Sequence, residues 1–375
     1  MNKQKVVIVR STYPYSDSRL LKTINYLLKS NFEVTVIGWN RQNAKEHGII
    51  SYNENIANII LYDVPSPHGL GIKGFSKLIG FNRWIKKQLK RCGKVDFIHA
   101  CDLDTGYTCC KFARKHKIKF IYDIYDYYVG SRKIPKPLKK ILEKQEIKVI
   151  NKADTVILCT EERKDEIKKA TPKSVEIIYN TPNIEQISKK KVIIEENDNC
   201  RLKLCYVGVL SNVRLLKEII DEIENHQDVE LHIGGIGPLS EEVAKKAQEL
   251  NNVYYYGRMN YHDVLALEKD CDVLFATYNP EIKGHKYSAP NKIYEAMGLS
   301  KPIIVCENTS IDKVVLENKC GLVCKYDAID FFEQCEILKD ESLRNMYSKN
   351  ALVAYDNKYS WNNNEITYNR IYNLK

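Results

Sequence analysis

Residues 202–235 read LKLCYVGVLSNVRLLKEIIDEIENHQDVELHIGG, the pattern of one strand–helix–strand unit. Two apolar runs, at 202–208 and 229–235, flank a stretch to about residue 225 whose apolar residues recur at helical spacing. Continuous apolar strands joined by helices are typical of a parallel sheet with both faces covered. Such sheets bind ligands at the carboxyl ends of their strands, so we look for candidate sites there.

The same alternation extends in both directions along the chain. Later strands are expected at 253–257, 271–278, 302–307 and 321–325, followed by a polar, helical tail from about residue 328. Earlier strands are expected at 5–10, 33–39, 58–64, 96–101, 119–124, 155–160 and 175–179, with helices near 18–30, 75–92, 104–116, 134–152 and 161–170. Between the two series lies a polar stretch with three consecutive lysines and the run EENDN, which has the composition of a linker.

A chain of 375 residues is long enough for two domains. We expect an α/β protein of two Rossmann-like, doubly wound domains that face a cleft. The expected divisions are an N-terminal domain at 1–183, a linker at 184–200, a second domain at 201–345 and C-terminal helices at 346–375. The net charge of +10 divides into +16 on residues 1–183 and −6 on residues 184–375, which favours an anionic partner for the first domain only.

The composition is globular, with 44% hydrophobic and 28% charged residues. No stretch approaches the ~18 uncharged apolar residues of a membrane span, and the N-terminal segment runs directly into a strand. Neither a membrane span nor a cleaved signal is therefore expected. The twelve cysteines lie mostly inside apolar runs and form no CxxC pair, which favours buried thiols in a reducing cytosol over disulfides or zinc. No nucleic-acid-binding module is present, so we expect no nucleic-acid partner.

The first candidate site follows the strand that ends at Gly208. Arg214 stands six residues later and is expected at the start of the next helix. A cation beside exposed loop amides suits a diphosphate, because backbone N–H groups and the helix dipole already favour anions there. The alternative is a solvated arginine at a helix start.

The second candidate site lies on a short helix that Pro290 opens and Gly298 ends. Lys292 and Glu295 are neighbours on this helix at i and i+3. A carboxylate near a helix start can hold the vicinal diol of a ribose, as the acidic residue of dinucleotide-binding folds does. The alternative is a surface ion pair.

Several motifs together carry a family resemblance. They are the glycine–cation pair just described, LHIGGIGP (231–238), YYYGRMN (254–260), CDVLFATYNP (271–280) and PNKIYEAMGLSKPII (290–304). This half resembles the nucleotide-binding domain of retaining GT-B glycosyltransferases of the family 4 type. The first half is similar too, in DSRLLKTINYLLKSNFEVTVIGWN (17–40), DFIHACDLDTG (96–106) and FIYDIYDYY (120–128). The closing YSWNNNEITYNRIY (359–372) resembles the helix that crosses back to the first domain in that fold.

The resemblance implies a nucleotide-sugar site in the second domain. Arg214 falls where the family has the lysine that grips the donor diphosphate, whereas Val209 replaces an expected second cation. Glu295 is the second glutamate of the family's E-x7-E signature and is expected to bind the ribose, whereas Tyr287 stands in the place of the first. The expected donor-binding set is Gly208, Arg214, Arg258, His285, Tyr287, Asn291, Lys292 and Glu295.

The resemblance also implies an acceptor side in the first domain. Many members carry H-x-H-[DE] after the fourth strand; here it reads His99-Ala100-Cys101-Asp102, with Cys101 in place of the second histidine. Asp102 and Asp104 are candidates for acceptor or sugar contacts, and Asp126 falls at an acidic position that faces the cleft. The expected catalytic residues are Arg214, Asp102 and Asp126.

The implied mechanism is front-face substitution with retained configuration. The leaving diphosphate takes the acceptor proton, while Arg214 and the amides near Asn291 stabilise its growing charge. No cofactor is expected besides the donor. The D-x-D tripeptides at 102–104 and 270–272 are more typical of hydroxyl-binding aspartates than of a metal site, so we expect metal independence. GGIGP (234–238) is only a partial G-x-G-x-x-G and is weak as an NAD motif.

Five lysines, one every fourth residue from Lys136 to Lys152, form a stripe on the helix expected at 134–152. Leu138, Ile141, Leu142 and Val149 are expected on another face. Near an anionic leaflet each lysine contributes about 1 kcal/mol of binding. The stripe therefore favours peripheral attachment to the cytoplasmic membrane face, and the alternative is a solvated lysine-rich surface.

The expected function is transfer of a sugar from a nucleotide diphosphate donor to an acceptor hydroxyl. The acceptor implied by the resemblance is a saccharide, and a lipid-linked saccharide of bacterial cell-surface polysaccharide assembly fits it. Two alternatives stay open: a nucleotide-sugar epimerase of the same fold, and a non-catalytic nucleotide-sugar-binding protein.

Overall fold

The computed structural model describes residues 3–44, 48–66, 72–130, 132, 134–182, 184, 201–282, 284–287 and 290–374. The chain folds as two compact units. The first consists of Met1–Ile178 together with Thr367–Lys375, and the second of Tyr179–Ile366. Apart from Ile184, the expected linker at 184–200 lies outside the described residues.

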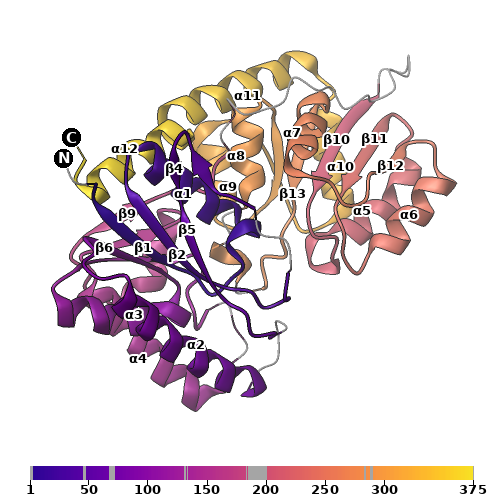
Figure 1. Cartoon of the computed structure of the whole chain (residues 1–375). Helices are drawn as coiled ribbons and strands as arrows, with labels where there is room; N and C mark the ends of the chain where they lie inside the picture. The colour runs from indigo at the N-terminus through magenta and orange to yellow at the C-terminus, as the bar shows by residue number, and fades with distance from the viewer. Residues whose placement is uncertain are drawn as a thin grey trace. The chain divides into compact units, whose positions relative to one another are not determined.

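The first unit is built on a parallel sheet of seven strands in the order β5-β2-β1-β6-β7-β8-β9 (Figure 1). The strands are β1 (Lys5–Val9), β2 (Glu33–Trp39), β5 (Asn58–Tyr62), β6 (Phe97–Cys101), β7 (Lys119–Asp123), β8 (Thr155–Leu158) and β9 (Val175–Ile177). All seven fall within the ranges expected from the apolar runs. A small antiparallel pair, β3 (Ser51–Tyr52) and β4 (Asn55–Ile56), was not expected because two-residue strands leave no periodic pattern.

Helices cover both faces of the first sheet. α2 (Ile72–Arg91), α3 (Leu103–His116) and α4 (Lys136–Lys152) pack in sequence on one face (Figure 1). Val7, Val9, Ile37 and Trp39 point into the core on that side. Successive strand residues point to opposite faces, so Val6 and Ile8 face the other side. There α1 (Ser18–Lys29) packs against β2.

The second unit repeats this plan with a six-stranded parallel sheet in the order β12-β11-β10-β13-β14-β15 (Figure 1). Its strands are β10 (Leu202–Val207), β11 (Val229–Gly234), β12 (Val253–Tyr255), β13 (Val273–Ala276), β14 (Ile303–Cys306) and β15 (Gly321–Cys324). The helices are α5 (Leu216–Glu222), α6 (Ser240–Glu249), α7 (Tyr261–Asp270), α8 (Asn291–Gly298), α9 (Ile311–Asn318), α10 (Ala328–Ile337) and α11 (Glu341–Ala354). The predicted α/β class with two Rossmann-like domains is thus confirmed.

The last helix, α12 (Trp361–Tyr372), joins the two units along the chain, because residues from Thr367 onward belong to the first. Its end is fixed there by buried tyrosines. The hydroxyl of Tyr368 lies 2.8 Å from the hydroxyl of Thr23 on α1, and the ring of Tyr368 stacks on that of Tyr26 at 4.9 Å. A π-helical turn, Tyr355–Tyr359, precedes α12.

The composition also predicted buried free cysteines and no membrane-spanning helix. Every described cysteine is free, and all but Cys92 are buried, as the apolar runs around them predict. Among the described residues, no helix combines the length and the apolar character that a membrane crossing requires.

Candidate functional site

In the second unit, the loops after β10 and β11 meet at the carboxyl edge of the sheet. The Gly208 amide donates to the Gly234 carbonyl at 3.0 Å. Gly235 has φ +117°, and a Cβ there would lie 1.8 Å from the Gly208 carbonyl oxygen. A Cβ on Gly237 would lie 2.1 Å from the carbonyl oxygen of Leu210. The glycines of the GGIGP motif are therefore explained by close packing of two backbone loops.

Arg214 lies between these loops and β13. It ends a single 3-10 turn, Asn212–Arg214, and Leu215 with φ +56° separates that turn from α5. The sequence placed Arg214 at the start of a continuous helix, but the left-handed residue breaks the helix there. The guanidinium lies over the ring of Tyr278, 4.2 Å from its centroid. Its buried Nε has no hydrogen-bond partner among the described residues.

Lys292 is buried beneath the same edge. Its ammonium donates a hydrogen bond to the carbonyl of Val207, the last residue of β10, and lies 4.6 Å from the centroid of the Tyr206 ring. Burial by itself would lower the pKa of Lys292, but its electrostatic surroundings, which include the carboxylate of Glu295, raise it overall. The alternative of a surface ion pair on α8 is excluded, because Lys292 and Glu295 are both buried.

Glu295 is 4% exposed and accepts a 3.0 Å hydrogen bond from the Tyr261 hydroxyl at the start of α7. Glu268, seven residues further along α7, is also buried, and its Oε2 has no partner in the described part of the chain. Burial raises the pKa of Glu268, and the charge of Glu295 raises it further. Glu268 therefore holds a proton more readily than an ordinary glutamate, while Glu295 presents an oriented acceptor.

The remaining expected donor-binding residues are placed around Arg214 and α8. The ring of His285 meets Tyr278 edge to face at 5.3 Å, and its Nδ1 donates to the Asn279 carbonyl at 3.0 Å. Burial lowers the pKa of His285, which keeps its imidazole neutral. Asn291 is the first residue of α8. Tyr287 is half-buried at the end of a 3-10 turn, and Arg258 is exposed in the loop after β12.

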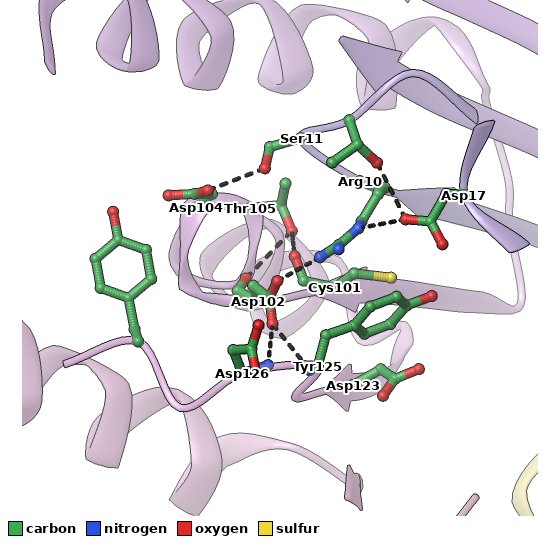
Figure 2. Close-up of polar contacts among 12 residues, drawn as sticks. Arg10, Ser11, Asp17, Cys101, Asp102, Asp104, Thr105, Asp123, Tyr125 and Asp126 are labelled. Carbon is green, nitrogen blue, oxygen red and sulfur yellow. Dashed lines mark hydrogen bonds and ion pairs between the residues drawn. The ribbon is translucent and has the colours of Figure 1, made fainter. Parts of the chain in front are cut away.

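In the first unit, Asp102 is the centre of a polar cluster at the carboxyl ends of β1, β6 and β7 (Figure 2). Its backbone has φ 58°, in the left-handed region. One carboxylate oxygen pairs with the Arg10 guanidinium. The other accepts hydrogen bonds from the amides of Tyr125 at 2.9 Å and Asp126 at 3.2 Å. Asp102 thus holds the β7 loop in place.

These contacts give Asp102 a structural role that the sequence did not indicate. Both oxygens have partners within the protein and position the loop after β7, and the catalytic role of Asp102 stays a prediction. Burial raises its pKa, and the charge of Arg10 opposes that rise. Asp104 stays nearer the surface and accepts from the Ser11 hydroxyl at 2.9 Å (Figure 2). The carboxylate of Asp126 is 61% exposed and pairs with Arg163 at 3.1 Å.

A second buried cluster, of His99, Cys101 and Asp123, has ligand atoms within 4.8 Å of one another. Asp123 already accepts from Arg19 at 2.7 Å and from His99 Nε2 at 3.3 Å. Nδ1 of His99 lies 2.7 Å from the Tyr372 hydroxyl. A guanidinium on the same carboxylate repels a second cation. Hydrogen bonding within the protein therefore accounts for this group of side chains.

Sequence reasoning missed several residues of these sites. Arg10 follows the first strand directly, and a cation at a strand end was the available signal. The ring of Tyr125 lies between two guanidiniums, 3.9 Å from Arg10 and 4.5 Å from Arg19. Tyr261 and Tyr278 give no pattern, because a single tyrosine is equally typical of a core position.

Two family models match the sequence. The model for Glycosyltransferase Family 4 matches residues 18–186, and the model for glycosyl transferases group 1 matches residues 201–340. They leave only 1–17, 187–200 and 341–375 outside. No curated protein is detectably similar to the chain in sequence.

Solved structures share the whole fold. Sucrose-phosphate synthase from Thermosynechococcus elongatus matches with a TM-score of 0.76 at 13% identity, over 99% of this chain and 98% of that one. HepE from Anabaena in complex with UDP matches with a TM-score of 0.70 at 13% identity, over 99% and 100%. A glycosyltransferase from Rickettsia africae gives 0.69 at 14% identity, over 99% and 98%.

At sequence identities this low, the structural similarity establishes the fold and leaves the substrates open. The family models add evidence from the sequence that the fold alone does not give, because one model matches within each half of the chain. Together with the two parallel-sheet units, they place the chain among the GT-B glycosyltransferases of the family 4 type, to which it belongs.

Proposed function

We propose that the protein transfers a sugar from a uridine diphosphate donor to an acceptor hydroxyl with retained configuration. The observation that carries this proposal is that Arg214 lies over Tyr278, in the loop after β13, while α8 buries a carboxylate, Glu295, that the Tyr261 hydroxyl orients. A guanidinium for a diphosphate and an oriented carboxylate for a ribose thus occupy one edge of one sheet. UDP is the nucleotide bound by the similar HepE structure.

The chemistry follows from these groups. The bond from the anomeric carbon to the diphosphate oxygen breaks, and a bond from the acceptor oxygen to the same face of that carbon forms. The acceptor proton passes to the departing diphosphate. Arg214 stabilises the charge that grows on the diphosphate, and one preorganised donor of this kind contributes roughly 10²–10³ in rate. In this scheme Asp102 is not the proton acceptor; it pairs with Arg10 and holds two loop amides.

We further propose that the reaction needs no divalent metal. In the first D-x-D tripeptide, Asp102 pairs with Arg10 and Asp104 with Arg132. In the second, the carboxylate of Asp272 accepts from the Lys203 amide at 2.9 Å. Three of the four aspartates thus already have a cationic or backbone partner within the protein, which disfavours a metal at these tripeptides.

A thermal-shift panel tests the donor site. A ligand at 100 times its Kd stabilises the folded state by about 2.7 kcal/mol, so UDP and UDP-sugars are expected to raise Tm, with or without chelator. Arg214→Ala and Glu295→Gln should each abolish the shift. Arg114→Ala, on the exposed end of α3, is the matched control and should retain it. A shift with NAD alone contradicts the proposal.

Turnover separates the proposed activity from its alternatives. A transferase releases UDP faster when acceptor is added, and Arg214→Ala lowers that rate. An epimerase interconverts UDP-sugars with no acceptor. A non-catalytic binding protein shows the thermal shift but releases no UDP under any condition.

We propose that the acceptor is a lipid-linked saccharide in polysaccharide assembly and that α4 attaches the protein to the inner membrane face. All five lysines of the stripe are exposed on α4. Leu138 and Ile141, which the sequence placed on another face of this helix, are 36% and 54% exposed. Their exposure adds an apolar contribution to the basic surface, as in helices that lie on a membrane.

Vesicle co-sedimentation tests this attachment. The protein should bind anionic vesicles more tightly than neutral ones at physiological salt. A triple variant on the stripe, with Lys140, Lys144 and Lys148 changed to Gln, should lose most of that preference. A triple variant of three exposed lysines in the second unit serves as control: Lys245, Lys269 and Lys313. Equal binding to both kinds of vesicle contradicts the proposal.

A further inference from the structure

Two arginines of the first unit, Arg41 and Arg132, stand at the same sheet edge as Asp102. Arg41 follows β2, and Arg132 follows β7. The strand order β2-β1-β6-β7 makes these four strands consecutive neighbours, so the loops after them meet at one edge. Ser11 links the two arginines: its carbonyl accepts from Arg41, and its hydroxyl donates to the Asp104 carboxylate that pairs with Arg132.

Arg41 is half-buried and has no carboxylate partner among the described residues. Its guanidinium stacks on the Trp39 ring at 3.7 Å, and its Nε donates to the Ser11 carbonyl at 2.8 Å. Burial lowers the pKa of Arg41. Both terminal nitrogens of this stacked guanidinium have no hydrogen-bond partner in the described part of the chain.

Arg132 has a matching arrangement and is 37% exposed. Its guanidinium stacks on the Tyr128 ring at 3.8 Å, and one nitrogen lies 3.4 Å from an Asp104 oxygen. That oxygen also accepts from Ser11. Asp104 thus pairs with Arg132, whereas no carboxylate pairs with Arg41 in the described residues.

The neighbouring Arg10 is different, because its charge is neutralised. Its Nε lies 3.0 Å from an Asp17 oxygen, and its Nη1 pairs with Asp102. The guanidinium donors that no carboxylate occupies at this edge therefore belong mainly to Arg41 and Arg132, which are held on aromatic faces. Planar guanidiniums held in this way suit bidentate recognition of phosphate or carboxylate.

We propose that Arg41 and Arg132 bind an anionic group of the acceptor substrate, a phosphate or a carboxylate. This inference depends on the proposed glycosyl transfer in one respect only, which is that the bound molecule is identified as the acceptor. Two sources share the required chemistry: the diphosphate of a lipid-linked saccharide, and the carboxylate of an acidic sugar.

The indole of Trp39 provides a local reporter. Its N–H donates to the Val64 carbonyl at 2.8 Å, directly beside the Arg41 stack. The chain has three tryptophans, so an ¹⁵N-labelled sample gives at most three indole signals. Inorganic pyrophosphate, geranyl diphosphate and glucuronate are titrated in turn, with geraniol and glucose as neutral counterparts.

We expect a saturable shift of the Trp39 indole signal with at least one anion and none with the neutral compounds. Arg41→Gln and Arg132→Gln should each weaken that binding at least tenfold. Arg41→Lys keeps the charge but loses the planar fork, so an intermediate loss is expected. Arg114→Gln is the matched control and should bind as the wild type does. Tighter binding of geranyl diphosphate identifies a lipid diphosphate, and tighter binding of glucuronate identifies an acidic sugar.

The inference is overturned if no anion shifts the Trp39 signal, or if both glutamine variants bind the anions unchanged. Tm values of the variants, measured alongside, show whether each is folded. Failure of the proposed donor chemistry gives a different result, because Arg214→Ala then leaves UDP binding unaffected while the Trp39 titration still succeeds.

Discussion

Arg10 and Asp102 form a buried ion pair across the neighbouring strands β1 and β6. Their side chains are 12% and 7% exposed. The same carboxylate caps the amides of Tyr125 and Asp126, so one pair links three strand ends. Burying two charges is favourable only when each stays paired and hydrogen-bonded.

A double-mutant cycle measures this link. Arg10→Met leaves the Asp102 carboxylate uncompensated, so we expect it to lower the unfolding free energy by about 3–5 kcal/mol. Asp102→Asn keeps an oxygen for the two amides but removes the charge. The double variant should lose less than the sum of the single losses, because neither charge then remains alone.

The control is the ion pair between Lys5 and Glu33, at 2.8 Å on the opposite end of β1 and exposed on both sides. Exposed pairs contribute roughly 0–1 kcal/mol. Chemical denaturation gives all the values. Equal coupling energies for the two pairs contradict the assigned role of Asp102.

Gly235→Ala tests the loop packing beneath the donor site. The new methyl group meets the Gly208 carbonyl oxygen, and the backbone at φ +117° is strained for alanine. We expect a loss of at least about 3 kcal/mol of unfolding free energy. Gly284→Ala is the matched control, because a Cβ there meets no atom within 4 Å. A Tm equal to that of the wild type for Gly235→Ala is the contrary result.

The buried carboxyl group of Glu146 is expected to make the unfolding free energy depend on pH. It is buried on α4, where it accepts from the Tyr122 hydroxyl at 3.1 Å and the Tyr128 amide at 3.2 Å. Burial raises its pKa from 4.5 to about 8. Between these values the folded state keeps a proton that the unfolded state releases. The unfolding free energy therefore falls as pH rises, by at most about 1.4 kcal/mol per pH unit from this group.

Glu146→Gln removes that proton uptake, so its unfolding free energy should fall less steeply between pH 5 and 8 than that of the wild type. Denaturant unfolding at several pH values measures both slopes. Glu143→Gln, on the same helix with its carboxylate toward Lys169, should keep the wild-type slope. Identical slopes for Glu146→Gln and the wild type contradict the prediction.

Tyr372→Phe tests how the last helix is held in the first unit. The Tyr372 hydroxyl donates to Nδ1 of His99, whose Nε2 donates to Asp123. Removing the hydroxyl leaves a buried acceptor without a partner, which costs about 1–3 kcal/mol. Tyr52→Phe, at a side chain 40% exposed, should change stability by less than about 0.5 kcal/mol. Equal melting temperatures for the two variants contradict the prediction.

Much of the fold was predictable from local pattern. Thirteen strands were expected, and each forms within its expected range. The physical reason is that a strand buried on both faces must be apolar along its whole length, so its sequence alone records its burial. The short pair β3 and β4 was missed because its side chains are mostly exposed and follow no such rule.

The candidate sites were predictable only in part. Glycines and cations at strand ends mark where ligand-binding edges form, and Gly208 and Arg214 lie at such an edge. The pattern does not record what a side chain meets there. Asp102 was expected to contact the acceptor or the sugar, and no local pattern indicated that Arg10, 92 positions earlier, pairs with it.

The sequence by itself determined the two parallel sheets, the unequal charge of the two halves and the strand ends that carry chemistry, because each depends on the composition of short segments. Only the tertiary structure decided which carboxylates are engaged and which guanidiniums are left with free donors. Glu295 accepts a hydrogen bond from Tyr261, 34 positions earlier. Arg41 stacks on Trp39 and has no carboxylate partner within the part of the chain that the structure describes. Such contacts depend on how loops from separate strands pack at one edge, and no local pattern encodes that packing.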